Sequence, residues 1–125
     1  MRPDQRDAAL LWDMLEYSRQ VGRITKGLAY AHYLKDRTLQ LAVERAVEVV
    51  GEAARHVSPA FKEAHPEISW RGIIAQRNVL AHEYGEIKQD RLWMAATERI
   101  PKLLELLAKL ELPPKPPESD AESSG

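Results

Sequence analysis

The sequence has no cysteine, few glycines and no strand-like alternation. None of its 125 residues is cysteine, and six are glycine. The absence of cysteine excludes disulfides, thiol catalysis and thiolate metal sites, and it agrees with a cytoplasmic location. Apolar and polar residues do not alternate as they do in half-buried strands. The chain is therefore expected to be all-α, and its length suffices for one domain with a modest core.

Long apolar runs and metal-binding patterns are also missing. No run of about 18 or more apolar residues occurs, so no transmembrane helix is expected, and the N-terminus lacks the apolar core of a signal peptide. His32, His56 and His65 are scattered without metal-ligand spacing. No glycine-rich phosphate-binding loop is present. We expect neither a metal nor a cofactor.

Apolar residues spaced three and four apart predict helices throughout the chain. We expect the first helix over residues 4–26, ended by Gly27, and then a short turn through residues 28–34. The carboxylate of Asp36 can cap a second long helix, rich in alanine, that reaches about residue 57. The small side chains of this second helix let another helix approach closely, so we expect it to be the central packing helix.

The second half of the chain carries three further helix signals. Ser58 followed by proline predicts the start of a short helix, and Ser69 is expected to cap the next one. A last helix should run over residues 88–112, with Pro101 kinking it or leaving a carbonyl unpaired. We therefore expect an antiparallel up-and-down bundle of four to five helices over residues 1–112. Residues 113–125, rich in proline and acids, should form a disordered tail.

Basic residues gather on one part of a chain whose net charge is −1. Arg19, Arg23 and Lys26 fall at helical spacing in a segment, residues 18–37, that contains a single acid. We call these three residues the basic stripe. It could hold an RNA phosphate backbone, or it could be a solvated helix face.

A polar motif in the fourth predicted helix, the one after Ser69, carries the chemistry. It consists of Arg77, Asn78, His82 and Tyr84. An arginine can grip a phosphate with two hydrogen bonds, and a histidine can move protons near neutral pH. At about 100° per residue, Arg77 and His82 point about 140° apart, whereas Arg77 and Tyr84 nearly align. Either the helix ends around residues 81–83 and releases His82, an early end that Gly85 favours, or a second chain completes the site.

RNA cleavage is the reaction that needs least from such a site. RNA supplies the 2′-hydroxyl nucleophile, and the protein needs a base, an acid and a cation. Two copies of His82 could be base and acid, two copies of Arg77 could hold the phosphate, and Asn78 could support either. The alternative is structural: Arg77 pairs with Glu48 or Glu52, and His82 satisfies carbonyls at a helix end.

The chain resembles HepT-like toxins of the HEPN superfamily, the type associated with minimal nucleotidyltransferases, over residues 4–110. The resemblance rests on the motif of Arg77, Asn78, His82 and Tyr84 and on two further segments. These segments are Val50-Gly51-Glu52-Ala53 and Pro66-Glu67-Ile68-Ser69-Trp70.

The resemblance implies a helical bundle that dimerises through the motif helix. It implies a metal-independent endoribonuclease toxin of a type VII-like toxin–antitoxin pair, with Arg77 and His82 catalytic. It also implies a cognate nucleotidyltransferase antitoxin that transfers AMP onto Tyr84, where bulk and negative charge would block RNA. Assembly beyond a dimer stays open. The alternative is a non-catalytic dimeric adaptor, or a protein that is mainly the substrate of that modification.

Overall fold

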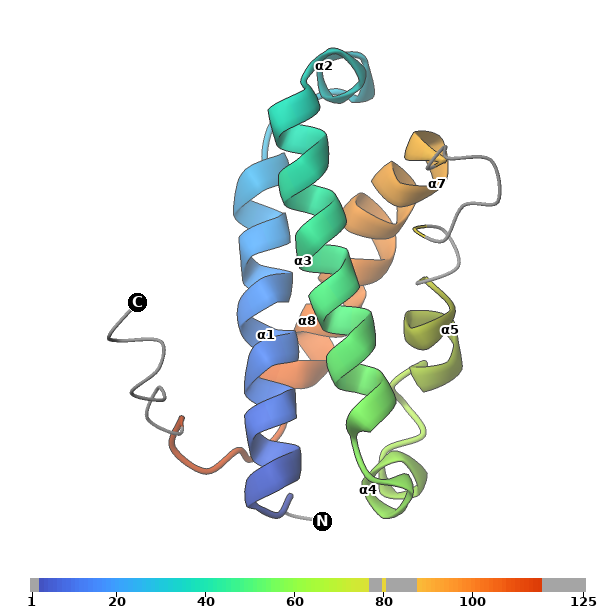
Figure 1. The fold of residues 1–125 in the computed structure, drawn as a ribbon. Coiled ribbons are helices and arrows are strands. Elements are labelled where there is room, and N and C mark those ends of the chain that lie inside the picture. The colour runs from blue at the N-terminus through green and yellow to red at the C-terminus, as the bar shows by residue number, and fades with distance from the viewer. Residues whose placement is uncertain (1–2, 77–79, 81–87, 116–125) are drawn as a thin grey trace, which may run out of the picture.

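The computed structural model describes residues 3–76, 80 and 88–115. Over these residues the chain is all-α, with no strand, which confirms the expected bundle. Two long helices, α1 (Gln5–Thr25) and α3 (Arg37–His56), lie side by side and antiparallel (Figure 1). The remaining elements are α2 (Tyr30–Lys35), α4 (Pro59–Ala64), α5 (Trp70–Ala75), α7 (Gln89–Met94), η1 (Ala95–Arg99) and α8 (Ile100–Ala108).

One hydrophobic core joins α1, α3 and the C-terminal helices. Leu11 and Met14 of α1, Val43 and Val50 of α3, and Ile100 of α8 are all fully buried in it. Each such side chain contributes about 1.5–3 kcal/mol when it leaves water. The α1–α3 pair is therefore the rigid scaffold on which α5 and α7 are placed.

Two predicted helix starts and one predicted end are confirmed by the backbone. Asp36 Oδ1 accepts a hydrogen bond from the Leu39 N–H at 3.0 Å, and Ser58 Oγ accepts one from the Phe61 N–H at 3.2 Å. Gly27, just beyond α1, has a φ of 74°, a conformation that side-chain-bearing residues rarely adopt. These signals are local, so the sequence contains them in full.

The expected turn over residues 28–34 is wrong, because much of this segment forms α2. Tyr33 is fully buried, its ring lies 4.8 Å from that of Trp93, and its hydroxyl donates to Gln89. A six-residue helix is not stable alone in water. It forms here because packing against residues that lie far along the chain stabilises it.

Ser69 occupies the start of α5, but its hydroxyl makes no capping hydrogen bond, contrary to the prediction. Its ψ of 70° departs from the extended conformation of residues whose side chains cap a helix. The Ser69 hydroxyl instead lies beside Gly72, where an added Cβ would come within 3.0 Å of it.

The irregularity expected at Pro101 takes the form of a π-helical turn. The Ile100 N–H donates to the carbonyl of Ala95, five residues back, and the Thr97 hydroxyl donates to the Trp93 carbonyl at 2.8 Å. The wider turn lies directly before the proline, which lacks an N–H, and the helix resumes as α8.

The described part of the predicted tail lies against the bundle. Residues 113–115 contact α1, and residues 116–125 lie outside the described residues, so their predicted disorder stays a prediction. Of the helices that the structure describes, none has the length and apolar character needed to cross a membrane.

Candidate functional site

The predicted site residues Arg77, Asn78, His82 and Tyr84 lie outside the described residues. We refer to residues 77–87 as the motif segment. The structure describes the residue on each side of it, Gln76 after α5 and Lys88 before α7, and one residue within it, Leu80. Figure 1 shows the two flanks. The flanks therefore show how the bundle holds the segment.

Leu80 attaches the middle of the motif segment to the core. It is helical, half-buried and packed against the core cluster. It stands three residues after Arg77 and two before His82. The core therefore holds the segment between the two residues that are predicted to be catalytic.

The N-terminal flank is fixed by α5, which packs on α3. Trp70 is 8% exposed, and its Nε1 donates to the His65 carbonyl at 3.0 Å. Its ring meets that of Phe61 edge-on, and Ile73 is buried one turn later. Trp70 is thus a core residue and is not available to stack on a base.

A cavity of about 450 Å³ lies beside this flank, between α5 and α8. Gln76 lines it and is only 1% exposed, and in the described part of the chain its Oε1 has no hydrogen-bond partner. Arg99 and Lys102 contribute cations to the lining, and Glu67 contributes a carboxylate. The two cations could hold a phosphate of a polynucleotide beside the residue that precedes Arg77.

The C-terminal flank is fixed by a hydrogen-bond network at Gln89. The Tyr33 hydroxyl donates to Gln89 Oε1, and Gln89 Nε2 donates to Glu44 Oε2 at 2.7 Å. Arg37 donates to the same Glu44 oxygen at 2.9 Å. We call Tyr33, Gln89, Glu44 and Arg37 the Gln89 network. It joins α2, α3 and α7, so the chain leaves the motif segment at a fixed point.

The protonation of Tyr33 suits its place in the Gln89 network. Burial raises the pKa of the Tyr33 phenol well above its ordinary value, and the nearby charge of Glu44 raises it further. The hydroxyl therefore stays a donor at neutral pH. The rings of Tyr30 and Trp93 pack around it.

The acids that the sequence offered as structural partners of Arg77 lie on α3. Glu48 pairs with Arg45 at 3.0 Å, and Glu52 contacts His56 at 3.0 Å. These contacts do not test the alternative pairing, because Arg77 is outside the described residues. Over residues 3–76, 80 and 88–115, no cluster of three or more histidines, aspartates or glutamates could bind a metal.

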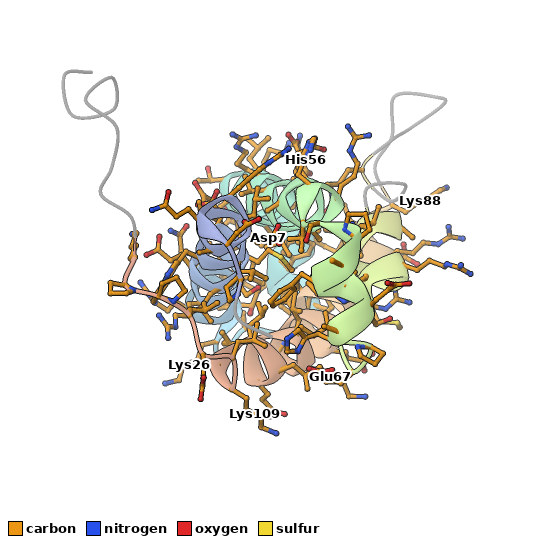
Figure 2. The ribbon with its side chains drawn as sticks, turned by 90° about the horizontal axis from the view of Figure 1, so that it is seen from below. Asp7, Lys26, His56, Glu67, Lys88 and Lys109 are labelled. Atoms are coloured by element: carbon orange, nitrogen blue, oxygen red, sulfur yellow. The ribbon has the colours of Figure 1, made fainter. Side chains whose placement is uncertain are left out.

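The basic stripe is exposed but is not brought to the motif flanks. Arg19, Arg23 and Lys26 are all exposed on α1. Lys26 and Lys88 lie on opposite sides of the bundle when it is viewed from below (Figure 2). RNA bound along the stripe would have to pass around the bundle to reach the motif segment of the same chain.

Four side chains at the described flanks, or in the cavity beside Gln76, were not singled out from the sequence. They are Gln76, Gln89, Arg99 and Lys102. Arg99 and Lys102 stand three residues apart in a predicted helix, which is a usable signal for a shared face. The two glutamines carry no such signal, since their roles depend on partners far along the chain.

Comparison with known proteins finds similarity over most of the chain. The family model described as Ribonuclease HepT-like matches residues 14–110, which include the motif. "Putative RNase MJ1380" of Methanocaldococcus jannaschii is 35% identical over 95 residues, covering 76% of this chain and 87% of that protein. "Probable ribonuclease HepT" of Thermococcus cleftensis is 35% identical over 100 residues, covering 80% of this chain and 91% of that protein. No solved structure matches the chain. The chain therefore belongs to the Ribonuclease HepT-like family.

Proposed function

We propose that this family member is a metal-independent endoribonuclease toxin that cleaves RNA at a site shared by two chains. Arg77 and His82 are its catalytic residues, and Asn78 supports them. The observation that carries the proposal is the family match over residues 14–110, which contains all three. The ribonuclease names of the similar proteins support RNA as the substrate.

The reaction is a transfer within the RNA strand. His82 of one chain takes the proton of the 2′-hydroxyl, whose oxygen then bonds to the adjacent phosphorus. The bond from phosphorus to the 5′-oxygen breaks, and that oxygen takes a proton from His82 of the other chain. Arg77 stabilises the charge that develops on the phosphoryl oxygens. The products are a 2′,3′-cyclic phosphate and a 5′-hydroxyl.

The described flanks support such a site because the rate of the reaction depends on how precisely the catalytic side chains are held. The motif segment follows the buried Gln76, packs on the core through Leu80 and leads into the Gln89 network. A catalytic group displaced by about 1 Å can lose on the order of 100-fold in rate. Three attachments over so short a segment would limit such displacement.

The cleavage proposal is tested with purified chain and a labelled RNA in the presence of EDTA. Wild type should cleave, and Arg77→Ala and His82→Ala should each lower the rate by about 100- to 10,000-fold. Arg71→Ala removes an exposed cation of α5 and should cleave normally. Equal rates for wild type and both motif variants would sink the catalytic assignment.

The shared site is tested by mixing chains. Dimers of one wild-type and one His82→Ala chain should lose most activity, because one reaction uses both histidines. Half of the wild-type rate would instead indicate two independent sites. The same RNA with a 2′-deoxy group at the cleavage point should stay intact.

The proposal includes control by a nucleotidyltransferase antitoxin that transfers AMP from ATP onto Tyr84. Each AMP places a negative phosphate near Arg77 and repels the RNA backbone. Incubation with the cognate enzyme and ATP should raise the mass by whole AMP units and abolish cleavage. Tyr84→Phe should block the mass change, whereas Tyr17→Phe, on α1, should not. An unchanged mass for wild type would refute this part alone.

A further inference from the structure

The first residues of the proline-rich tail lie along α1. Trp12 Nε1 donates to the Pro113 carbonyl at 2.9 Å, and the Lys115 ammonium pairs with the Glu16 carboxylate. This segment, drawn in red, passes beside the lower part of α1 (Figure 1). Glu16 is one helical turn beyond Trp12, so the tail runs toward the C-terminal end of α1.

The face of α1 that the tail contacts continues into the basic stripe. At about 100° per residue, Glu16, Arg19, Arg23 and Lys26 all lie within about 40° of the direction of Trp12. The three cations are exposed, and none of them forms an ion pair with another residue that the structure describes. The tail therefore lies on a face of α1 that becomes positively charged one turn further along the helix.

The spacing along this face of α1 matches the acids of the tail. A helix rises about 1.5 Å per residue, so Trp12 and Glu16 are about 6 Å apart along the axis. An extended proline-rich chain rises about 3.1 Å per residue, so Pro113 and Lys115 are also about 6 Å apart. Continued at this rate, Glu118 comes level with Arg23 and Asp120 with Lys26.

We propose that the acidic segment 118–122 docks on the basic stripe of its own chain and masks the stripe from RNA. The segment carries Glu118, Asp120 and Glu122 and no base. Anchoring at Pro113 and Lys115 gives it a high local concentration at the stripe. Exposed ion pairs are individually weak and screened by salt, so RNA, with its dense charge, can displace the segment. The masking of RNA rests on the proposed function, whereas the docking does not.

Docking is tested on the full chain with a spin label. Because the chain has no cysteine, Ser124→Cys gives one labelling site, nine residues beyond the anchored Lys115. At low salt the label should broaden amide resonances of α1 around Arg23. High salt should abolish the effect, and so should the triple variant E118Q/D120N/E122Q. A label at Ala60→Cys, exposed on α4, is the matched control.

The anchor is tested with Trp12→Phe, which keeps an aromatic ring but removes the donor to the Pro113 carbonyl. This variant should reduce the broadening around Arg23. The docking would be overturned if, at low salt, the label at position 124 broadened the α1 resonances no more than the label at position 60 does.

Masking is tested by the affinity for a single-stranded RNA that carries 2′-O-methyl groups and so cannot be cleaved. The triple acid variant should bind about three- to tenfold more tightly than wild type at low salt. In a chain with R19Q/R23Q/K26Q the acid variant should no longer matter. A gain that persists in that background would indicate general repulsion and overturn masking. Masking would also be overturned if the segment docks but wild type and the triple acid variant bind RNA with equal affinity. The cleavage proposal is tested separately, by the Arg77 and His82 variants.

Discussion

Replacing Gln89 with alanine tests how firmly the bundle fixes the end of the motif segment. The variant leaves the Tyr33 hydroxyl unpaired at a fully buried position, which costs about 1–3 kcal/mol. It also removes the hydrogen bond to Glu44, which is worth about 1 kcal/mol because Glu44 keeps Arg37 as a partner. The free energy of unfolding should therefore fall by about 2–4 kcal/mol, a large share of a typical domain's stability.

A double-mutant cycle isolates the hydrogen bond from the rest of the change. Tyr33→Phe alone should lower the free energy of unfolding by about 1 kcal/mol. It removes the donor to Gln89 Oε1, and Gln89 is only half-buried, so its oxygen can bond to water instead. The double variant has no unpaired hydroxyl, so it should cost about 1–2 kcal/mol less than the sum of the single variants. The measurement is urea unfolding followed by circular dichroism at one protein concentration. Costs that add within about 0.5 kcal/mol would refute the coupling.

The same variant separates positioning from stability. Val57→Ala removes a buried side chain at the opposite end of α3 and serves as a control for lost stability. Under conditions where both variants are folded, Gln89→Ala should slow RNA cleavage more than Val57→Ala. Equal rates would show that the Gln89 network stabilises the bundle without positioning the motif segment.

Three further predictions concern the bundle. Asp7 is buried, and its carboxylate accepts two hydrogen bonds from Ser58, one from the backbone N–H at 2.9 Å and one from the Ser58 hydroxyl at 2.6 Å. Asp7→Asn should lower the free energy of unfolding in urea by about 2–3 kcal/mol. An unchanged unfolding midpoint would contradict this. The pKa of Tyr33 is raised in the folded state, so the folded state keeps a proton that the unfolded state loses above about pH 10. The unfolding free energy should thus fall as the pH rises above about 10 and keep falling until the folded-state pKa is passed, and Tyr33→Phe should remove that part of the slope. Trp70→Phe removes the indole donor to the His65 carbonyl, which keeps the Ile68 N–H at 3.2 Å, so thermal unfolding should show a loss of about 1 kcal/mol. A variant as stable as wild type would argue against this anchor of α5.

The elements that could be predicted from the sequence are those set by neighbours along the chain. The caps at Asp36 and Ser58 and the end of α1 at Gly27 each depend on a few adjacent residues. The helix α2 could not be predicted in this way, because Tyr33 is buried by Gln89 and Trp93, about 60 residues away. Pro101 predicted an irregular turn, but whether that turn is π-helical depends on how the helix packs.

For the candidate site, the residue types were evident and the surroundings were not. Arginine, histidine and tyrosine at fixed spacing carry their chemistry in the sequence. That Gln76 would be buried beside a cavity, or that Lys26 and Lys88 would lie on opposite sides, follows only from how the helices pack. The exposure of the basic stripe could be predicted, but its separation from the motif flanks could not.

The burial of Leu80 bears on whether one chain can hold a complete site. Leu80 is helical and faces the core of its own chain. On a regular helix, Arg77 would point about 60° to one side of Leu80, and His82 would point about 160° to the other. His82 would then face away from its own bundle, toward whatever packs on the outside of the motif segment. If the helix were regular, the groups that meet His82 would thus come from outside its own core. This geometry favours a second chain as the source of the groups that meet His82, which is what the mixed-dimer experiment measures.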